Sequence, residues 1–121
     1  MFKILPLFFG YYRFDYAEPE SHSFLPFYMM GKETMLDEAT KNALKPVHAD
    51  ELLYLFDFGF DLTLDKDIQM REIMVKYWTN FAKYGNPSPV LSDDLAQWLT
   101  YSSEKVYSYS CIRYFQLITL H

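Results

Sequence analysis

The chain is poor in cysteine, and this scarcity excludes two kinds of site. Its 121 residues include a single cysteine, Cys111. A disulfide within the chain and a metal site built from cysteine ligands both need at least two. Because the sequence offers Cys111 no basic or helix N-terminal setting, a free structural thiol is the expectation.

Charge blocks and long hydrophobic runs are also missing. Sixteen acidic residues against eleven Lys and Arg give a net charge of −5, spread along the chain. No phosphate-binding stripe results, so we expect no nucleic-acid partner. The apolar run at residues 4–9 is shorter than a signal peptide requires, and no small-residue cleavage site follows it. No run approaches the length of a membrane span.

Aromatic residues, in contrast, are abundant. A fifth of the chain is aromatic, including eleven Phe and eleven Tyr, and half of it is apolar. This composition is too hydrophobic for a disordered chain. A free domain of this length buries only roughly two-thirds of the surface that its unfolded chain exposes. We therefore interpret the chain as one compact domain or a fragment of a larger one, whose aromatics pack partly on a surface outside this sequence.

The clearest predicted element is a long amphipathic helix near residues 66–84. Apolar side chains recur there at three- and four-residue steps, which places them on one stripe: Met70, Ile73, Met74, Tyr77, Trp78 and Phe81. Asp65 or Asp67 is expected to be the N-cap. Gly85 stands where a left-handed residue ends a helix, and Pro87 prevents continuation.

Shorter elements are predicted elsewhere. Tyr11–Tyr16 (YYRFDY) and residues 105–109 (KVYSY) have strand propensity. Residues 37–44 favour a short helix, and residues 48–56 favour a loop that runs into a helical turn. The tail from residue 111 to residue 121 is apolar and receives no assignment.

Three histidines are candidates for acid–base chemistry. His121 is terminal and is expected to be frayed, and His22 lies in a Ser-rich loop typical of an ordinary surface residue. His48 stands at a loop-to-helix junction, directly before two acids and an apolar run. An imidazole presented by such a loop suits proton transfer near neutral pH. On the local pattern alone, a structural or exposed histidine is the more frequent alternative.

Other chemical roles find less support in the residues. His48 and Glu51 have a spacing that metal ligands sometimes use, but no third ligand has a matching position, so no metal or cofactor is predicted. Asp50 and Glu51 are too near in sequence to reach a ring nitrogen of His48 with good geometry, and they are expected to cap the following helix. No G-x-S-x-G serine turn exists among the four glycines.

Three blocks of the sequence resemble type-B carboxylesterases, especially the insect esterases. Tyr11–Tyr16 is similar to the strand that precedes the catalytic histidine in that family. His48–Phe56 (HADELLYLF) is similar to the catalytic-histidine motif, and Met74–Pro87 resembles the helix that follows it. Trp98 stands where the family has a late tryptophan. The blocks keep the family order over about residues 11–98, roughly three-quarters of the chain.

The resemblance implies an α/β fold in which residues 1–121 are part of a carboxylesterase domain, the C-terminal fragment of an α/β-hydrolase, with one or two strands and several helices. It also implies that His48 takes the proton from a serine and returns it to the leaving alcohol of a carboxylic ester. The family's acid, serine and oxyanion-hole loop lie upstream of every block found here. The isolated chain is therefore expected to be inactive.

The sequence departs from the family in several places. Lys45 stands three residues before the histidine, where the family usually has glycine, and Pro46 and Val47 follow it. Lysine lacks the backbone freedom of glycine and proline fixes φ, which puts the conformation of this loop in question. Leu99 replaces a common proline, and residues 1–10 and 111–121 do not resemble the family.

Two other functions stay open on the sequence. The first is a non-catalytic, esterase-like interaction module or truncated relic, against which His48 counts because a degenerate member has no need of that residue. The second is an unrelated small α+β domain whose motif matches are accidental.

Overall fold

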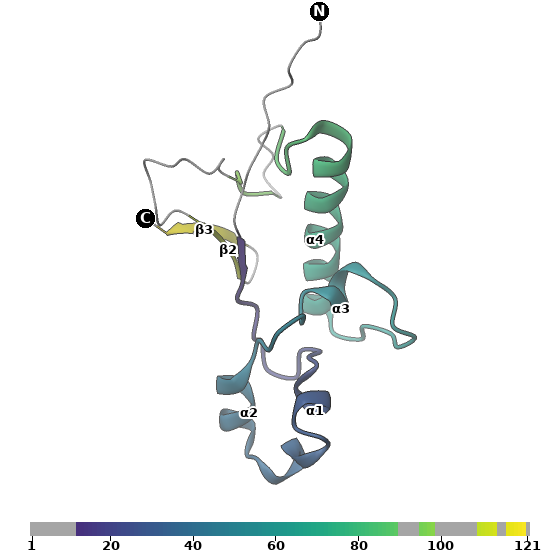
Figure 1. Ribbon diagram of the computed structural model, residues 1–121, viewed down its shortest axis with the longest axis vertical. Helices are drawn as coiled ribbons and strands as arrows, with labels where there is room; N and C mark the ends of the chain where they lie inside the picture. The colour runs from purple at the N-terminus through teal and green to yellow at the C-terminus, as the bar shows by residue number, and fades with distance from the viewer. Residues whose placement is uncertain (1–11, 90–94, 99–108, 114–115, 121) are drawn as a thin grey trace, which may run out of the picture.

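One long helix, several short helices and a three-stranded sheet make up the part of the chain that the computed structural model describes, residues 12–89, 95–98, 109–113 and 116–120 (Figure 1). In chain order the elements are β1 (Tyr12–Phe14), α1 (Leu25–Tyr28), the 3-10 helix η1 (Lys32–Met35), α2 (Glu38–Leu44), α3 (Leu52–Leu55), α4 (Asp65–Tyr84), β2 (Tyr109–Arg113) and β3 (Gln116–Leu120). α3 packs on one end of α4, and α1 and α2 lie beyond that end.

The long helix α4 confirms the prediction for residues 66–84 and begins one residue earlier. Gly85 ends it with φ +68°, and its N–H donates to the carbonyl of Phe81 at 2.8 Å. The predicted N-cap is wrong, because Leu64 occupies that position without a side-chain cap bond. Asp65 and Asp67 lie inside the first turn instead. Their charges still favour the helix N-terminus, but the Asp67 carboxylate binds partners far along the chain.

The core forms around the predicted stripe of α4. Met70, Met74 and Tyr77 are buried, and they pack with buried residues from other segments: Tyr16, Leu53, Tyr54, Leu95 and Trp98. Ile73 and Trp78 are partly buried against the same cluster. Phe81, the last residue of the stripe, is 48% exposed. The stripe is therefore confirmed except at its C-terminal end.

The sheet has the order β1-β2-β3, with β1 and β2 parallel and β2 and β3 antiparallel. The strand predicted at residues 11–16 is confirmed over Tyr12–Phe14. Most of the strand predicted at residues 105–109 lies outside the described residues, and β2 begins at Tyr109. The expected one or two strands become three, because the unassigned tail pairs with β2 as β3.

Two of the short helices lie where the sequence predicts them. α2 confirms the helix predicted at residues 37–44, and the Asp37 carboxylate caps it by accepting from the Thr40 N–H at 2.7 Å. α3 confirms the predicted helical turn after His48. Residues 1–10 and His121 lie outside the described part of the chain.

Met74→Ala is expected to lower the free energy of unfolding by about 2–5 kcal/mol, because the Met74 side chain is fully buried and its removal leaves a cavity. Glu72→Ala, an exposed position on the same helix, is the matched control and is expected to change it by less than about 0.5 kcal/mol. Urea denaturation followed by circular dichroism measures both. Equal effects of the two substitutions would contradict the placement of the core.

Candidate functional site

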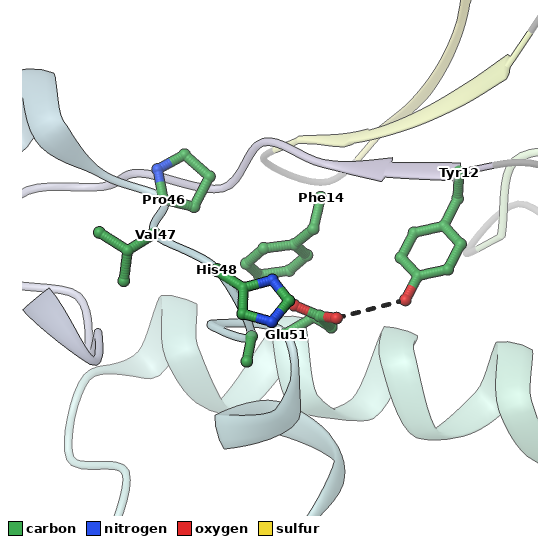
Figure 2. Close-up of a pocket in the computed structure, with 7 residues that line it drawn as sticks. Tyr12, Phe14, Pro46, Val47, His48 and Glu51 are labelled. Carbon is green, nitrogen blue, oxygen red and sulfur yellow. Dashed lines mark hydrogen bonds between the residues drawn. The ribbon is translucent and has the colours of Figure 1, made fainter. Parts of the chain in front are cut away.

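A shallow pocket of about 430 Å³ opens between β1 and the loop that joins α2 to α3 (Figure 2). Tyr12 and Phe14 line it from β1, where residues two apart point to the same face of a strand. The other wall comes from the loop and the start of the next turn: Pro46, Val47, His48, Ala49 and Glu51. The pocket thus joins the strand and the histidine segment that the sequence singled out separately.

His48 lies at the tip of a tight turn. The Asp50 N–H donates to the Val47 carbonyl at 3.2 Å, so that His48 and Ala49 are the two central residues of the turn. Ala49 has φ +70°, a left-handed conformation that costs a residue with a Cβ atom about 1–2 kcal/mol. The His48 side chain is exposed. Within the part of the chain that the structure describes, no hydrogen bond joins its imidazole to another side chain.

The residue at position 45 does not need the conformational freedom of glycine. Lys45 has φ −86° and ψ 156°, an extended conformation open to every residue type. Its ammonium group donates to the Ser21 carbonyl at 3.0 Å. The departure from the family's usual glycine is therefore compatible with the backbone observed here.

Asp50 and Glu51 do not cap α3, which corrects the role expected for them. The residue at the N-cap of α3 is Glu51, and its side chain makes no cap bond. The Asp50 carboxylate is buried and accepts three hydrogen bonds, from Ser23 Oγ, the Phe24 N–H and the Val47 N–H. The turn is therefore bound to the segment before α1.

Glu51 instead contacts Tyr12 across the pocket. The Tyr12 hydroxyl donates to Glu51 Oε1 at 3.5 Å, the dashed line in Figure 2. The Tyr12 ring also packs edge-on against Trp78 and Trp98, with ring centroids 5.1 and 5.5 Å apart. Burial, and then the nearby Glu51 carboxylate, raise the pKa of the Tyr12 phenol above its usual value. One wall of the pocket is thus held by both polar and aromatic contacts.

His22 is not an ordinary surface residue, and that prediction is wrong. Its Nδ1 lies 2.7 Å from Asp67 Oδ2, and its backbone N–H donates to the same oxygen at 3.0 Å. The imidazole also stacks on the Phe60 ring, with centroids 5.3 Å apart and planes 2° from parallel. The side chain is 28% exposed. The structure therefore brings His22 to Asp67, whereas His48 faces the pocket with Tyr12 and Glu51.

Asp67 is the buried residue that the sequence reasoning missed. It is fully buried and also accepts from the Tyr16 hydroxyl at 2.8 Å and the Tyr54 hydroxyl at 3.4 Å. Burial, and then the Asp67 charge, raise the pKa of Tyr54 above its usual value. A signal was present in the sequence, because Asp67 lies three residues before Met70 and so continues the buried stripe of α4.

The described ranges of the chain contain no group of three or more His, Cys, Asp or Glu side chains placed to hold a metal ion. No helix there is both long and apolar enough to cross a membrane.

Comparison with known proteins relates this chain to esterases. It is 53% identical over 45 residues to juvenile hormone esterase of Tribolium castaneum, covering 35% of this chain and 8% of that protein. It is 40% identical over 60 residues to bile salt-activated lipase of Rattus norvegicus (47% and 10%) and 35% identical over 69 residues to acylcarnitine hydrolase of Mus musculus (53% and 12%). The chain thus spans about a tenth of the length of these relatives.

The family model of the carboxylesterases matches residues 6–116. No solved structure gives a significant match. The part of each relative that is matched is small, which agrees with a fragment of a larger domain of α/β-hydrolase origin. Because the family model covers most of the sequence, the chain belongs to the carboxylesterase family.

Proposed function

We propose that the chain is the C-terminal part of a serine carboxylic-ester hydrolase, similar to the insect esterases, and that His48 is its general base. The observation that carries this proposal is the setting of His48. It is an exposed imidazole at the mouth of a pocket, on a turn fixed by hydrogen bonds, in a chain of the carboxylesterase family. A histidine that has to meet a serine from another segment needs such a position.

The chemistry follows from the imidazole. In the complete enzyme, His48 removes the proton from the serine hydroxyl as the oxygen attacks the ester carbonyl, and it returns that proton to the departing alcohol. The resemblance to the family implies that the serine, the acid and the oxyanion hole belong to an upstream part of the domain, and these residues contain no G-x-S-x-G turn. The names of the relatives, an esterase, a lipase and a hydrolase, support an ester as the substrate class.

A second function is favoured by a different observation, the apolar surface of α1 and η1. Phe27 is 76% exposed, and Met30 and Met35 are each 85% exposed. These three large apolar side chains lie within residues 27–35 and are open to water, and exposed apolar side chains that adjoin one another can mark a binding surface. A non-catalytic, esterase-like interaction module would use such side chains to bind a partner.

The isolated chain is expected to hydrolyse a nitrophenyl ester no faster than free imidazole at equal concentration. An imidazole without nucleophile, acid and oxyanion hole lacks the contributions that dominate the rate. In an enzyme encoded by a longer message, His48→Ala is expected to lower kcat by about a thousandfold or more. Initial-rate kinetics measure both effects.

The same substitution at the last residue, His121→Ala, is the control and is expected to leave kcat unchanged. Long-read sequencing of the transcript tests the premise, because the proposal requires an in-frame upstream segment that contains G-x-S-x-G. Saturable hydrolysis by the isolated chain that disappears in His48→Ala would contradict the proposal.

The Tyr12 phenol is expected to titrate above the pH at which exposed tyrosines ionise, because burial and the Glu51 charge both disfavour the phenolate. Because the pKa of Tyr12 is higher in the folded chain than in the unfolded chain, the free energy of unfolding falls as the pH rises from the unfolded pKa through the folded pKa. Glu51→Gln lowers the pKa of Tyr12 only in part, since burial is the larger cause. A pH titration of the tyrosine Cζ resonances, assigned with Tyr12→Phe, measures this. Glu72→Gln is the control, and an equal shift in both variants would refute the contact.

The interaction function predicts a stoichiometric complex with a partner protein in size-exclusion chromatography. The triple variant Phe27→Ser, Met30→Ser, Met35→Ser is expected to lose that complex, because it removes the exposed apolar side chains. His48→Ala is expected to keep it. Absence of any complex, or its loss in His48→Ala alone, would count against this second function.

A further inference from the structure

The segment at residues 22–24 runs between two buried carboxylates. On one side, Asp67 of α4 accepts from the backbone N–H and from Nδ1 of His22. On the other side, Asp50 accepts from Ser23 Oγ and from the Phe24 N–H, both at 2.7 Å. Both residues are buried, since Asp67 is 0% exposed and Asp50 is 2% exposed. The segment therefore links α4 to the turn that carries His48.

The Asp50 carboxylate also closes that turn. Oδ2 accepts from the Val47 N–H at 2.9 Å, while the Asp50 N–H donates to the Val47 carbonyl at 3.2 Å. Val47 and Asp50 are thus joined by two hydrogen bonds, with His48 and Ala49 between them. Hydrogen bonds to a charged acceptor are stronger than those between neutral groups. Val47 and Asp50, the first and last residues of the turn, each donate one of these hydrogen bonds to the other.

The turn needs this support because of the residue at its third position. Turns with a left-handed third residue usually have glycine there, and here Ala49 adopts φ +70°. A Cβ atom disfavours that conformation, so the isolated turn would populate other backbone conformations. The imidazole of His48 receives no side-chain hydrogen bond from the described residues, so the backbone of the turn sets the region that the ring can reach.

We propose that Asp50 is the positioning residue for His48: its carboxylate binds Val47, Ser23 and Phe24 and thereby holds the strained turn in the conformation that directs the imidazole into the pocket. This inference rests on the proposed role of His48 as general base. A base must lie within hydrogen-bond reach of the proton that it removes, and misplacement by about 1 Å costs about a hundredfold in rate. Asp50 itself transfers no proton in this scheme.

Asp50→Asn in the full chain is the first test, because it keeps the shape and replaces one acceptor oxygen with a donor. The remaining oxygen can accept from only one of the Phe24 and Val47 N–H groups, which bind different oxygens of Asp50. Amide hydrogen exchange of the other is expected to accelerate by about tenfold or more, the effect of losing a hydrogen bond to a charged group. The His48 ring resonances are expected to show greater mobility by carbon relaxation. The ring of His22, bound by Asp67, serves as the internal reference and is expected to stay unchanged.

Asp37→Asn is the matched control. It makes the same carboxylate-to-amide change in the exposed cap of α2, and is expected to leave the His48 ring unchanged. Ser23→Ala removes a single bond to Asp50 and is expected to give a smaller effect in the same direction. It therefore keeps the inference testable if Asp50→Asn does not fold.

The rescue variant separates positioning from general stability. Adding Ala49→Gly to Asp50→Asn removes the Cβ penalty at φ +70°, so the mobility of the His48 ring is expected to fall back toward that of the unsubstituted chain. Unchanged exchange of both Val47 and Phe24, together with unchanged His48 mobility, in Asp50→Asn, or in Ser23→Ala where only that variant folds, would overturn the inference. Amide hydrogen exchange and ring relaxation can be measured without catalytic activity. An inactive longer enzyme would thus contradict the proposed function but not the dependence of the turn on Asp50.

Discussion

The buried carboxylate of Asp67 is the constraint on which the arrangement of the chain depends. A charge taken out of water is costly unless it is paired and hydrogen-bonded, and Asp67 occupies a position on the apolar stripe of α4. The cost is offset by the Tyr16 hydroxyl and by two groups of His22. Since Tyr16 follows β1 and His22 precedes α1, one carboxylate fixes both segments against α4.

A series of hydrogen bonds connects Asp67 to the candidate site. Asp67 holds His22, the next two residues bind Asp50, and Asp50 binds the turn that presents His48. The opposite wall of the pocket is set by β1, whose Tyr12 packs on the aromatic rings of Trp78 and Trp98. Contacts that lead back to α4 therefore fix both walls of the pocket. This explains how His48 can have a defined backbone position, although its side chain makes no hydrogen bond to another side chain among the described residues.

Local sequence patterns predict the elements that depend on local physics. The three- and four-residue steps from Met70 to Tyr77 predict α4, and Gly85 predicts its end, because periodicity and left-handed backbone are properties of neighbouring residues. The partners of Asp67, and two of the three partners of Asp50, lie far away in sequence, so local patterns predict these acids as helix caps. The pairing of His22 was missed for the same reason, and β3 was missed because its apolar residues show no alternation.

The parallel pairing of β1 with β2 carries a consequence for the order of folding. Tyr12 pairs with Ser110, from opposite ends of the described chain, and closing so large a loop costs entropy before any contact rewards it. The helices and the cluster around Met74 rely on nearer contacts and can form without that closure. During synthesis β1 emerges well before β2, so the edge of β1 that pairs with β2 is open to other strands until the residues of β2 have been made.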